Sequence, residues 1–397
     1  MTAEIAVLNK SAVALASDSA VTISAGPREE KIYFTADKLF ELSRRNPIGI
    51  MIYNGMQFMQ APLHMLIDNY RQECREFDHV QDAAVDFLHY LNKWGQSAPP
   101  EVTEQAVQAV LLPVVTLVAD RITDKITALV RKGPSDDLND QVTRAISDVL
   151  GSFERIYHGS PQADFIGAKP RITKERDALI RRIATMVAPE GGEQHERLVA
   201  ILKLALLKLP LSDSKTGIVI AGFGAKDIFP TLVSYEIDGL LFGRLKYRQT
   251  NFVDIDRRAD RARVLPFAQK EMVERFLYGI DADIERKISQ FAKATVTEIT
   301  NEILKYLDMS DEDKQSLQEK AKAAETAFLE GLKGTAFDQI RSESQIAVEG
   351  MVEFMPKPEL ATMAEALVNL TSIKRRVSRG METVGGPFDV AVISRSE

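Results

Sequence analysis

The stretch that decides the fold is Thr2–Thr22, with the sequence TAEIAVLNKSAVALASDSAVT. It contains two apolar runs, Ile5–Leu8 and Ala12–Ala16, and the pair Asn9-Lys10 lies between them. Short apolar runs bounded by turn-forming residues are typical of strands in a buried sheet. We therefore predict that the chain opens with two paired strands.

Thr2 becomes the first residue when Met1 is removed. A hydroxyl beside a free α-amino group is one form of an activated nucleophile. Only Met1 precedes Thr2, so we expect activation to depend on methionine removal alone. A small residue after Met is common, so Thr2 carries weight only together with other residues.

Composition excludes several classes of protein. The 397 residues are 45% hydrophobic and carry a net charge of −7, which allows a large core and argues against a general nucleic-acid binder. Cys74 is the only cysteine, which excludes a disulfide within the chain and a cysteine-rich zinc site. We therefore expect neither a metal nor another cofactor.

The sequence predicts a cytoplasmic protein that does not enter the membrane. The first residues lack the basic stretch and apolar core of a signal peptide. No uninterrupted apolar run approaches the roughly 18 residues needed to span a bilayer. The best candidate, Ile201–Leu211, is interrupted by Lys203, Lys208 and Pro210.

Strand and helix patterns alternate in large blocks, which predicts an α+β protein. Expected strands lie at residues 31–34, 38–42, 48–53, 216–221, 228–247 and 388–393, and the last is expected to be buried. A hairpin turn is expected at Glu236–Gly239. Helical spacing covers residues 57–209, 271–333 and 358–377, and Ser310 with Asp313 predicts a helix start.

Several of these residues together resemble a known family. Thr2 is followed sixteen residues later by Asp18, a lysine opens a short strand at Lys38 or at Lys31, and a glycine pair precedes the last strand in Gly385–Ser394. This pattern resembles the β-subunits of proteasomes and the bacterial proteasome-like peptidases of the N-terminal nucleophile (Ntn) hydrolase class. The chain would be a divergent, enlarged bacterial branch of that family.

The resemblance implies a four-layer αββα Ntn-hydrolase sandwich with two large helical insertions. The core would comprise residues 1–60, 213–280 and 346–397, and the insertions residues 61–212 and 281–345. Ordinary proteasome subunits have no counterpart to the two insertions. Ring assembly, and with it a homo-oligomer, is likewise an expectation from the resemblance.

The resemblance also implies a mechanism. Thr2 Oγ would attack a peptide carbonyl, and its own α-amino group would take the proton. Lys38, or failing that Lys31, would lower the pKa of that amine so that it is neutral near pH 7. Asp18 would pair with the lysine and hold it in place.

Six more residues would complete the site. The oxyanion would be bound by a backbone N–H at Asn54 or Gly55. Val21 and Thr22 would lie along the substrate as a strand edge and part of a side-chain pocket. The family has an aspartate and a serine before the glycine pair, and here Glu382 and Thr383 would have to replace them.

The predicted function is that of a threonine-type endopeptidase acting on a peptide or protein substrate, with an unfoldase or regulator as a further partner. Two alternatives remain open. The same fold would serve as a catalytically silent assembly or regulatory subunit that binds partners through its helical insertions. It would also suit an amide hydrolase that acts on a small molecule.

Overall fold

The computed structural model describes residues 2–26, 29–131, 137–306, 310–378 and 384–395. The chain divides into two compact units. Unit 1 comprises Met1–Asp37 and Ile255–Glu397, and unit 2 comprises Lys38–Asp254. Each unit has its own antiparallel sheet together with helices, so the predicted α+β class is confirmed.

The sheet of unit 1 is built around the opening stretch of the chain. Strand β1 (Ala3–Asn9) pairs with β2 (Val13–Asp18), which confirms the predicted strand pair. On the other side β1 pairs with β13 (Ala262–Ala268), and β2 pairs with β14 (Phe388–Ile393). The strand order is β13-β1-β2-β14, so the two opening strands occupy the centre of this sheet.

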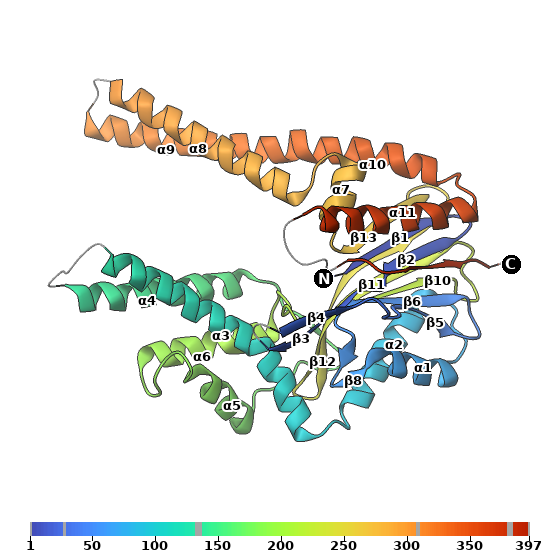
Figure 1. Cartoon of the computed structure of the whole chain (residues 1–397). Coiled ribbons are helices and arrows are strands. Elements are labelled where there is room, and N and C mark those ends of the chain that lie inside the picture. Colours follow the sequence, from blue (N-terminus) through green and yellow to red (C-terminus); the bar gives the residue numbers. More distant parts are fainter. Residues whose placement is uncertain (1, 27–28, 132–136, 307–309, 379–383, 396–397) are drawn as a thin grey trace. The chain divides into compact units, whose positions relative to one another are not determined.

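Helices cover one face of this sheet (Figure 1). They are α7 (Glu271–Tyr278), α10 (Asp338–Val352) and α11 (Lys357–Arg376). Alternate strand residues pack against them because successive side chains on a strand point to opposite faces. From the strands these core residues are Ala3, Ile5, Val7, Ala14, Ala16, Ala262 and Val264.

The last strand differs from the prediction of a buried strand. β14 has only β2 as a neighbour and forms the edge of the sheet. Val390 and Val392 are 36% and 41% exposed as a consequence. The apolar run of this strand therefore lies on a half-buried edge, which the sequence alone does not distinguish from a central strand.

A long helical hairpin extends unit 1 (Figure 1). Helix α8 (Ala282–Tyr306) packs against α9 (Asp311–Gly331). The chain then continues without a break through a π-helical turn, Leu332–Phe337, into α10. The Ser310 hydroxyl accepts the backbone N–H of Asp313 at 3.2 Å, which confirms the predicted helix start.

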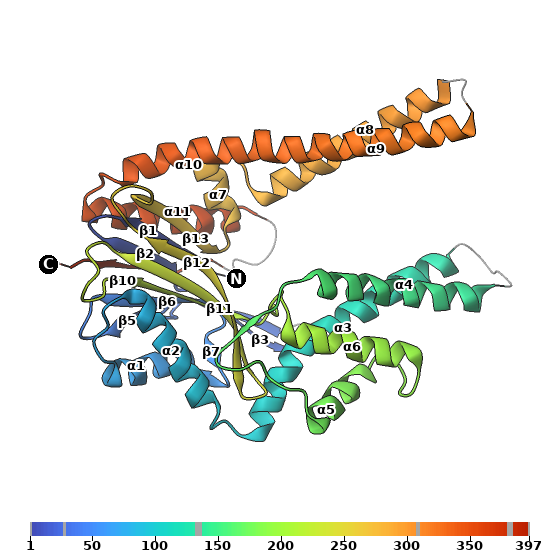
Figure 2. The same cartoon turned by 180° about the vertical axis from the view of Figure 1, so that it is seen from behind.

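Unit 2 contains the larger sheet (Figure 2). Its strands in spatial order are β5 (Leu39–Ser43), β6 (Ile48–Asn54), β10 (Thr216–Gly222), β11 (Thr231–Leu241), β12 (Arg244–Asp254) and β9 (Asp164–Phe165). Helices α1 (Leu63–Glu73) and α2 (Val80–Gly95) pack against this sheet in one apolar core.

The predicted hairpin turn at Glu236–Gly239 is wrong. β11 runs through these residues to Leu241, and the chain reverses at Phe242 and Gly243, which both have positive φ. Gly239 instead lies beside an irregularity in the pairing with β12. A glycine inside a strand often marks such a bulge, and the sequence pattern alone resembles that of a turn.

Four helices of unit 2 form a second apolar core, to which Leu241 at the end of β11 also contributes. They are α3 (Pro100–Val130), α4 (Leu138–Gly159), α5 (Lys174–Ala184) and α6 (Glu193–Leu207). The part of the expected insertion that packs as a separate helical body thus begins at Pro100, because α1 and α2 belong to the core of the sheet.

One described helix, α3, is long and apolar enough by length and composition to cross a membrane. Polar and charged residues interrupt its sequence, so it contains no long uninterrupted apolar run. Its buried side chains, among them Val107, Leu111 and Val118, contribute to the core shared with α4, α5 and α6. A core helix that packs in this way passes the same test, so the finding is weak evidence for a membrane span.

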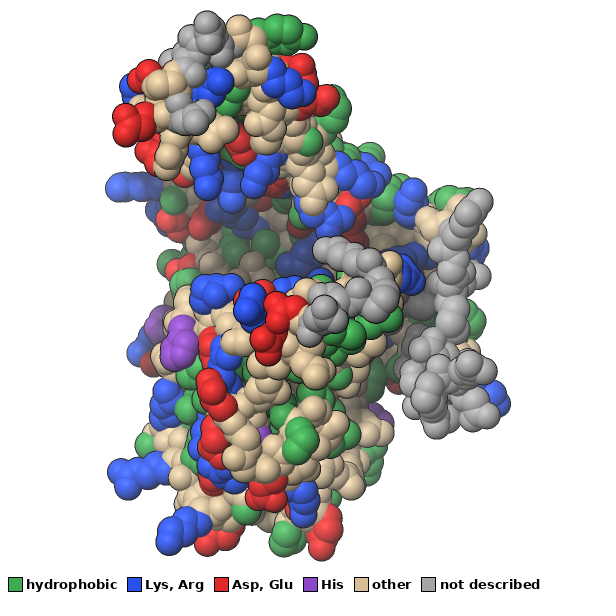
Figure 3. Space-filling model, turned by 90° about the vertical axis from the view of Figure 1, so that its left-hand side faces the viewer, with side chains coloured by type: hydrophobic (Ala, Val, Ile, Leu, Met, Phe, Trp, Pro, Cys, Tyr) green, Lys and Arg blue, Asp and Glu red, His purple; other side chains and the backbone are tan. Residues whose placement is uncertain are grey.

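The charged surface agrees with the mixed composition. On the face shown in Figure 3, Lys and Arg side chains are interspersed with Asp and Glu side chains. A broad basic face, which nucleic-acid binding requires, is not visible in this view of the described residues.

Candidate functional site

Thr2 and Asp18 lie at neighbouring strand ends in unit 1. Thr2 immediately precedes β1, and Asp18 is the last residue of β2. The backbone N–H of Ala3 donates to Asp18 Oδ1 at 3.1 Å. The structure thus brings together the two residues that the sequence pattern placed sixteen positions apart, and both are buried.

The second oxygen of Asp18 binds the other end of the chain. The backbone N–H of Gly385 donates to Asp18 Oδ2 at 3.2 Å. The preceding Val384 is attached to α11, because its carbonyl accepts the Ser372 hydroxyl at 3.3 Å. Gly386 has φ 87°, a conformation that favours glycine. The glycine pair therefore has a structural reason in this chain.

Glu4 is a member of this cluster that the family pattern does not include. The Thr2 hydroxyl donates to Glu4 Oε2 at 3.1 Å, and the Glu4 side chain is completely buried. Ser17 lies directly opposite Glu4 in the β1–β2 pair. Its buried hydroxyl has no hydrogen-bond partner among the described residues. In the sequence, Glu4 stands out as the only charged residue of an otherwise largely apolar strand.

The carbonyl of Thr2 is held by the residue that follows β13. It accepts the backbone N–H of Gln269 at 3.2 Å. Ala268 just before it has φ 55°, an uncommon conformation for a residue with a side chain. Arg375 of α11 donates from Nε to the Gln269 side-chain oxygen. Nothing in the local sequence marks Gln269 or Arg375, since their proximity to Thr2 is a property of the folded chain.

The two candidate lysines lie in different surroundings. Lys38, the first residue of unit 2, is fully buried, and its carbonyl accepts the backbone N–H of Ile52 at 3.0 Å. Lys31 lies on β4 (Glu29–Tyr33) and is exposed. Burying a lysine ammonium group is energetically unfavourable unless the charge is paired or hydrogen-bonded. A buried lysine is therefore more indicative of a specific role than an exposed lysine.

The predicted oxyanion loop lies in unit 2 at the end of β6. Asn54 closes the strand with φ 62° and is exposed. A Cβ on Gly55 would lie 2.1 Å from Thr216 Oγ1 on the neighbouring strand. The absence of a side chain at Gly55 is therefore required by the adjacent strand, whatever role its amide has.

Of the remaining four predicted residues, Val21 is described in full, Thr22 in part, and two not at all. Val21 is half-buried on β3 (Val21–Gly26) and pairs with Tyr33 of β4. The backbone of Thr22 belongs to the same strand. Glu382 and Thr383 lie outside the described residues.

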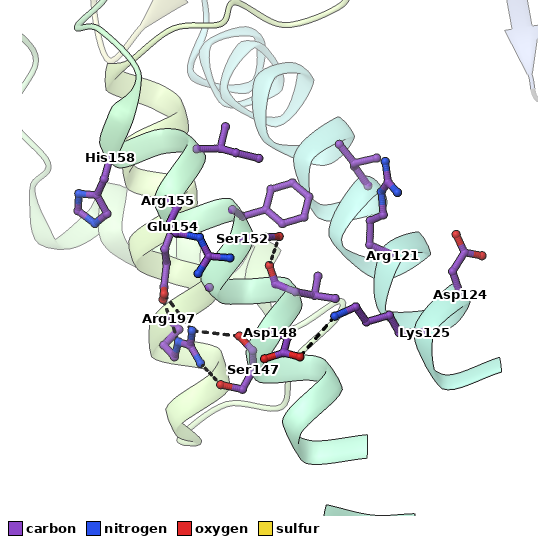
Figure 4. Close-up of a pocket in the computed structure, with 15 residues that line it drawn as sticks. Arg121, Asp124, Lys125, Ser147, Asp148, Ser152, Glu154, Arg155, His158 and Arg197 are labelled. Atoms are coloured by element: carbon purple, nitrogen blue, oxygen red, sulfur yellow. Dashed lines mark hydrogen bonds and ion pairs between the residues drawn. The ribbon is translucent and has the colours of Figure 1, made fainter. Parts of the chain in front are cut away.

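A separate polar pocket of about 990 Å³ lies among α3, α4 and α6 of unit 2 (Figure 4). Arg197 binds Glu154 at 2.8 Å and Ser147 at 2.8 Å, and this pairing lowers the pKa of Glu154. Lys125 lies 3.5 Å from Asp148. Many of the charges in the pocket thus compensate one another. Among the described residues, no group of three or more His, Cys, Asp or Glu side chains is placed to hold a metal ion.

No protein-family model matches this chain, and no curated protein matches it in sequence. The resemblance to proteasome β-subunits therefore remains a prediction that rests on the residues described above.

Replacing Asp18 by Asn tests the carboxylate that joins the two strand ends. Asn has one acceptor oxygen and one donor NH₂ group, so one of the two backbone N–H groups would face another donor. We expect a loss of about 1–3 kcal/mol in the free energy of unfolding. Hydrogen exchange should also become faster at Ala3 or Gly385. Glu365→Gln, exposed on α11, should change neither measurement.

Proposed function

We propose that this chain is a proteasome-like threonine-type peptidase that uses Thr2 as its nucleophile after removal of Met1. The observation that carries the proposal is the buried Asp18 carboxylate, which binds the amide next to Thr2 and the amide of Gly385. Three parts of the sequence pattern belong to unit 1, namely Thr2, Asp18 and the glycine pair. Hydrogen bonds through Asp18 bring them together.

The remaining roles come from the resemblance. In the proposal Lys38 takes the part of the family lysine, Asn54 or Gly55 supplies the oxyanion amide, and the two sheets form the inner layers of an αββα sandwich. The buried position of Lys38 and the exposed position of Lys31 support the choice of Lys38. The proposed setting is the cytoplasm, and the proposed substrate is a peptide or protein, with an unfoldase or regulator as a further partner. An amide hydrolase acting on a small molecule would use the same nucleophile, and substrate profiling would separate the two activities.

The intact mass of the protein, measured before and after treatment with a peptide β-lactone, tests the nucleophile. We expect loss of Met1 and one covalent adduct, because a β-lactone acylates a reactive hydroxyl. Thr2→Ala should carry no adduct, and Ser11→Ala, at the exposed opposite end of the opening strands, should react like the unaltered protein. A protein whose Thr2 takes no adduct would contradict the proposal, and retention of Met1 would contradict an α-amine base.

The same reaction distinguishes the two lysines. With the α-amine as the base, Lys38→Met should slow acylation at least about 100-fold, since the charge that favours a neutral amine would be lost. Lys31→Met should have little effect, because this side chain is exposed. Thermal unfolding of both variants reports whether the fold is retained. A larger loss of rate for Lys31→Met than for a folded Lys38→Met would assign the role to Lys31.

A second candidate function, an assembly subunit, is supported by helix α8. Its side chains Ile288, Phe291, Ile299, Ile303 and Tyr306 are 42–85% exposed. They recur at helical spacing and form a stripe along α8. Four of the five members lie about equally far in sequence from Thr295, two on each side, and Tyr306 has no counterpart. Two antiparallel copies of such a stripe would bring like residues face to face, so the partner we propose is a second copy of this chain.

Sedimentation velocity of the purified protein tests this surface. We expect a dimer, and Phe291→Glu should raise its dissociation constant at least about tenfold, because a charge would be buried in an apolar contact. Ile346→Glu, on α10 and also exposed, is the matched control and should leave the dimer unchanged. A protein that stays monomeric, or a Phe291→Glu variant that dimerises normally, would contradict the assembly.

A further inference from the structure

The contact between Thr2 and Glu4 has a chemical consequence that the family pattern does not supply. The Thr2 O–H group points its proton at Glu4 Oε2 across 3.1 Å. A general base must lie within about 2.6–3.2 Å of the proton-bearing atom, so this carboxylate is in reach. Because the hydroxyl is the donor in this hydrogen bond, the lone pairs of Thr2 Oγ remain available to attack an electrophile.

The position of Glu4 on the strand keeps this contact in place. Its backbone pairs with Ser17 of β2 and with Phe267 of β13, so both sides of β1 restrain it. The side chain is fully buried in a strand whose other residues are apolar apart from the terminal Asn9. Carboxylates are rarely buried without a specific role or partner, and here one partner is the hydroxyl of the proposed nucleophile.

Ser17 supplies a second, independent observation. It lies directly across from Glu4, and its Oγ is buried without a hydrogen-bond partner among the described residues. An unsatisfied buried hydroxyl is costly unless another polar group binds it. A water molecule or a substrate group bound there would satisfy this hydroxyl next to the Glu4 carboxylate.

We propose that Glu4 is a catalytic residue, the general base that takes the proton of Thr2. This inference rests on the proposed function, since it requires Thr2 to be the nucleophile. The Thr2 O–H bond breaks, its proton passes to Glu4 Oε2, and Oγ bonds to the carbonyl carbon. The proton then moves to the leaving nitrogen as the C–N bond breaks. Water hydrolyses the resulting ester and regenerates Thr2 and the carboxylate.

The proposal separates the base from the α-amino group. An amine base requires a free N-terminus at Thr2, whereas a carboxylate at Glu4 does not. Two electrophiles distinguish these cases, because a β-lactone needs only the hydroxyl and an epoxyketone closes a ring with both the hydroxyl and the free amine. A protein fraction that retains Met1 should therefore react with the β-lactone and not with the epoxyketone.

The deciding experiment measures the rate of β-lactone acylation by intact mass for the full chain and for Glu4→Gln. Gln keeps the shape of Glu but accepts no proton at neutral pH, so we expect the rate to fall at least about 100-fold. Glu353→Gln removes a carboxylate that binds Lys10 near the opposite end of β1, and it should react like the unaltered protein.

Each outcome has a defined meaning. Slow acylation of a folded Glu4→Gln variant supports the proposal, with thermal unfolding as the measure of folding. If Glu4→Gln does not fold, Glu4→Asp, which keeps the charge but withdraws it by one methylene, should fold and react more slowly. Acylation of the folded variant within about threefold of the normal rate would overturn the role of Glu4 and leave Thr2 as nucleophile. No acylation of the unaltered protein would contradict the proposed function itself, and with it this inference.

Discussion

One buried carboxylate determines how the two ends of the chain meet. Asp18 accepts the backbone N–H of Ala3 with one oxygen and that of Gly385 with the other. A buried backbone N–H without an acceptor is costly in a folded protein, and Asp18 accepts both of these amides. The start of β1 and the approach to β14 therefore share one acceptor, which positions Thr2 at the edge of a fixed backbone.

Hydrogen bonds hold both the side chain and the backbone of Thr2. Glu4 accepts its hydroxyl, and Gln269 donates to its carbonyl. Ala268 adopts a left-handed conformation just before Gln269, and Arg375 holds the Gln269 side chain. Backbone strain of this kind persists only where the surrounding structure enforces it, and it is found disproportionately at functional sites. A threonine held in this way has little freedom to change its orientation.

The helical parts of the chain serve two different structural purposes. Helices α1, α2, α7 and α11 cover sheets and contribute to their cores. Helices α3–α6 form a second apolar core, and α8 with α9 forms a hairpin that keeps apolar side chains exposed. A helix with an exposed apolar stripe can bury it against a partner, which is the physical basis of the proposed assembly.

The sequence by itself determined the local elements, because they depend on short-range spacing. Short apolar runs bounded by turn residues specified β1 and β2, and Ser310 specified the start of α9, since pattern and capping act within a few residues. Only the tertiary structure decided that Gly239 lies in a bulge, that β14 is an edge strand and that α1 and α2 belong to the sheet. It alone placed Gln269 beside Thr2 and buried Lys38 while exposing Lys31. These features depend on contacts between residues far apart in the chain, which no local pattern contains.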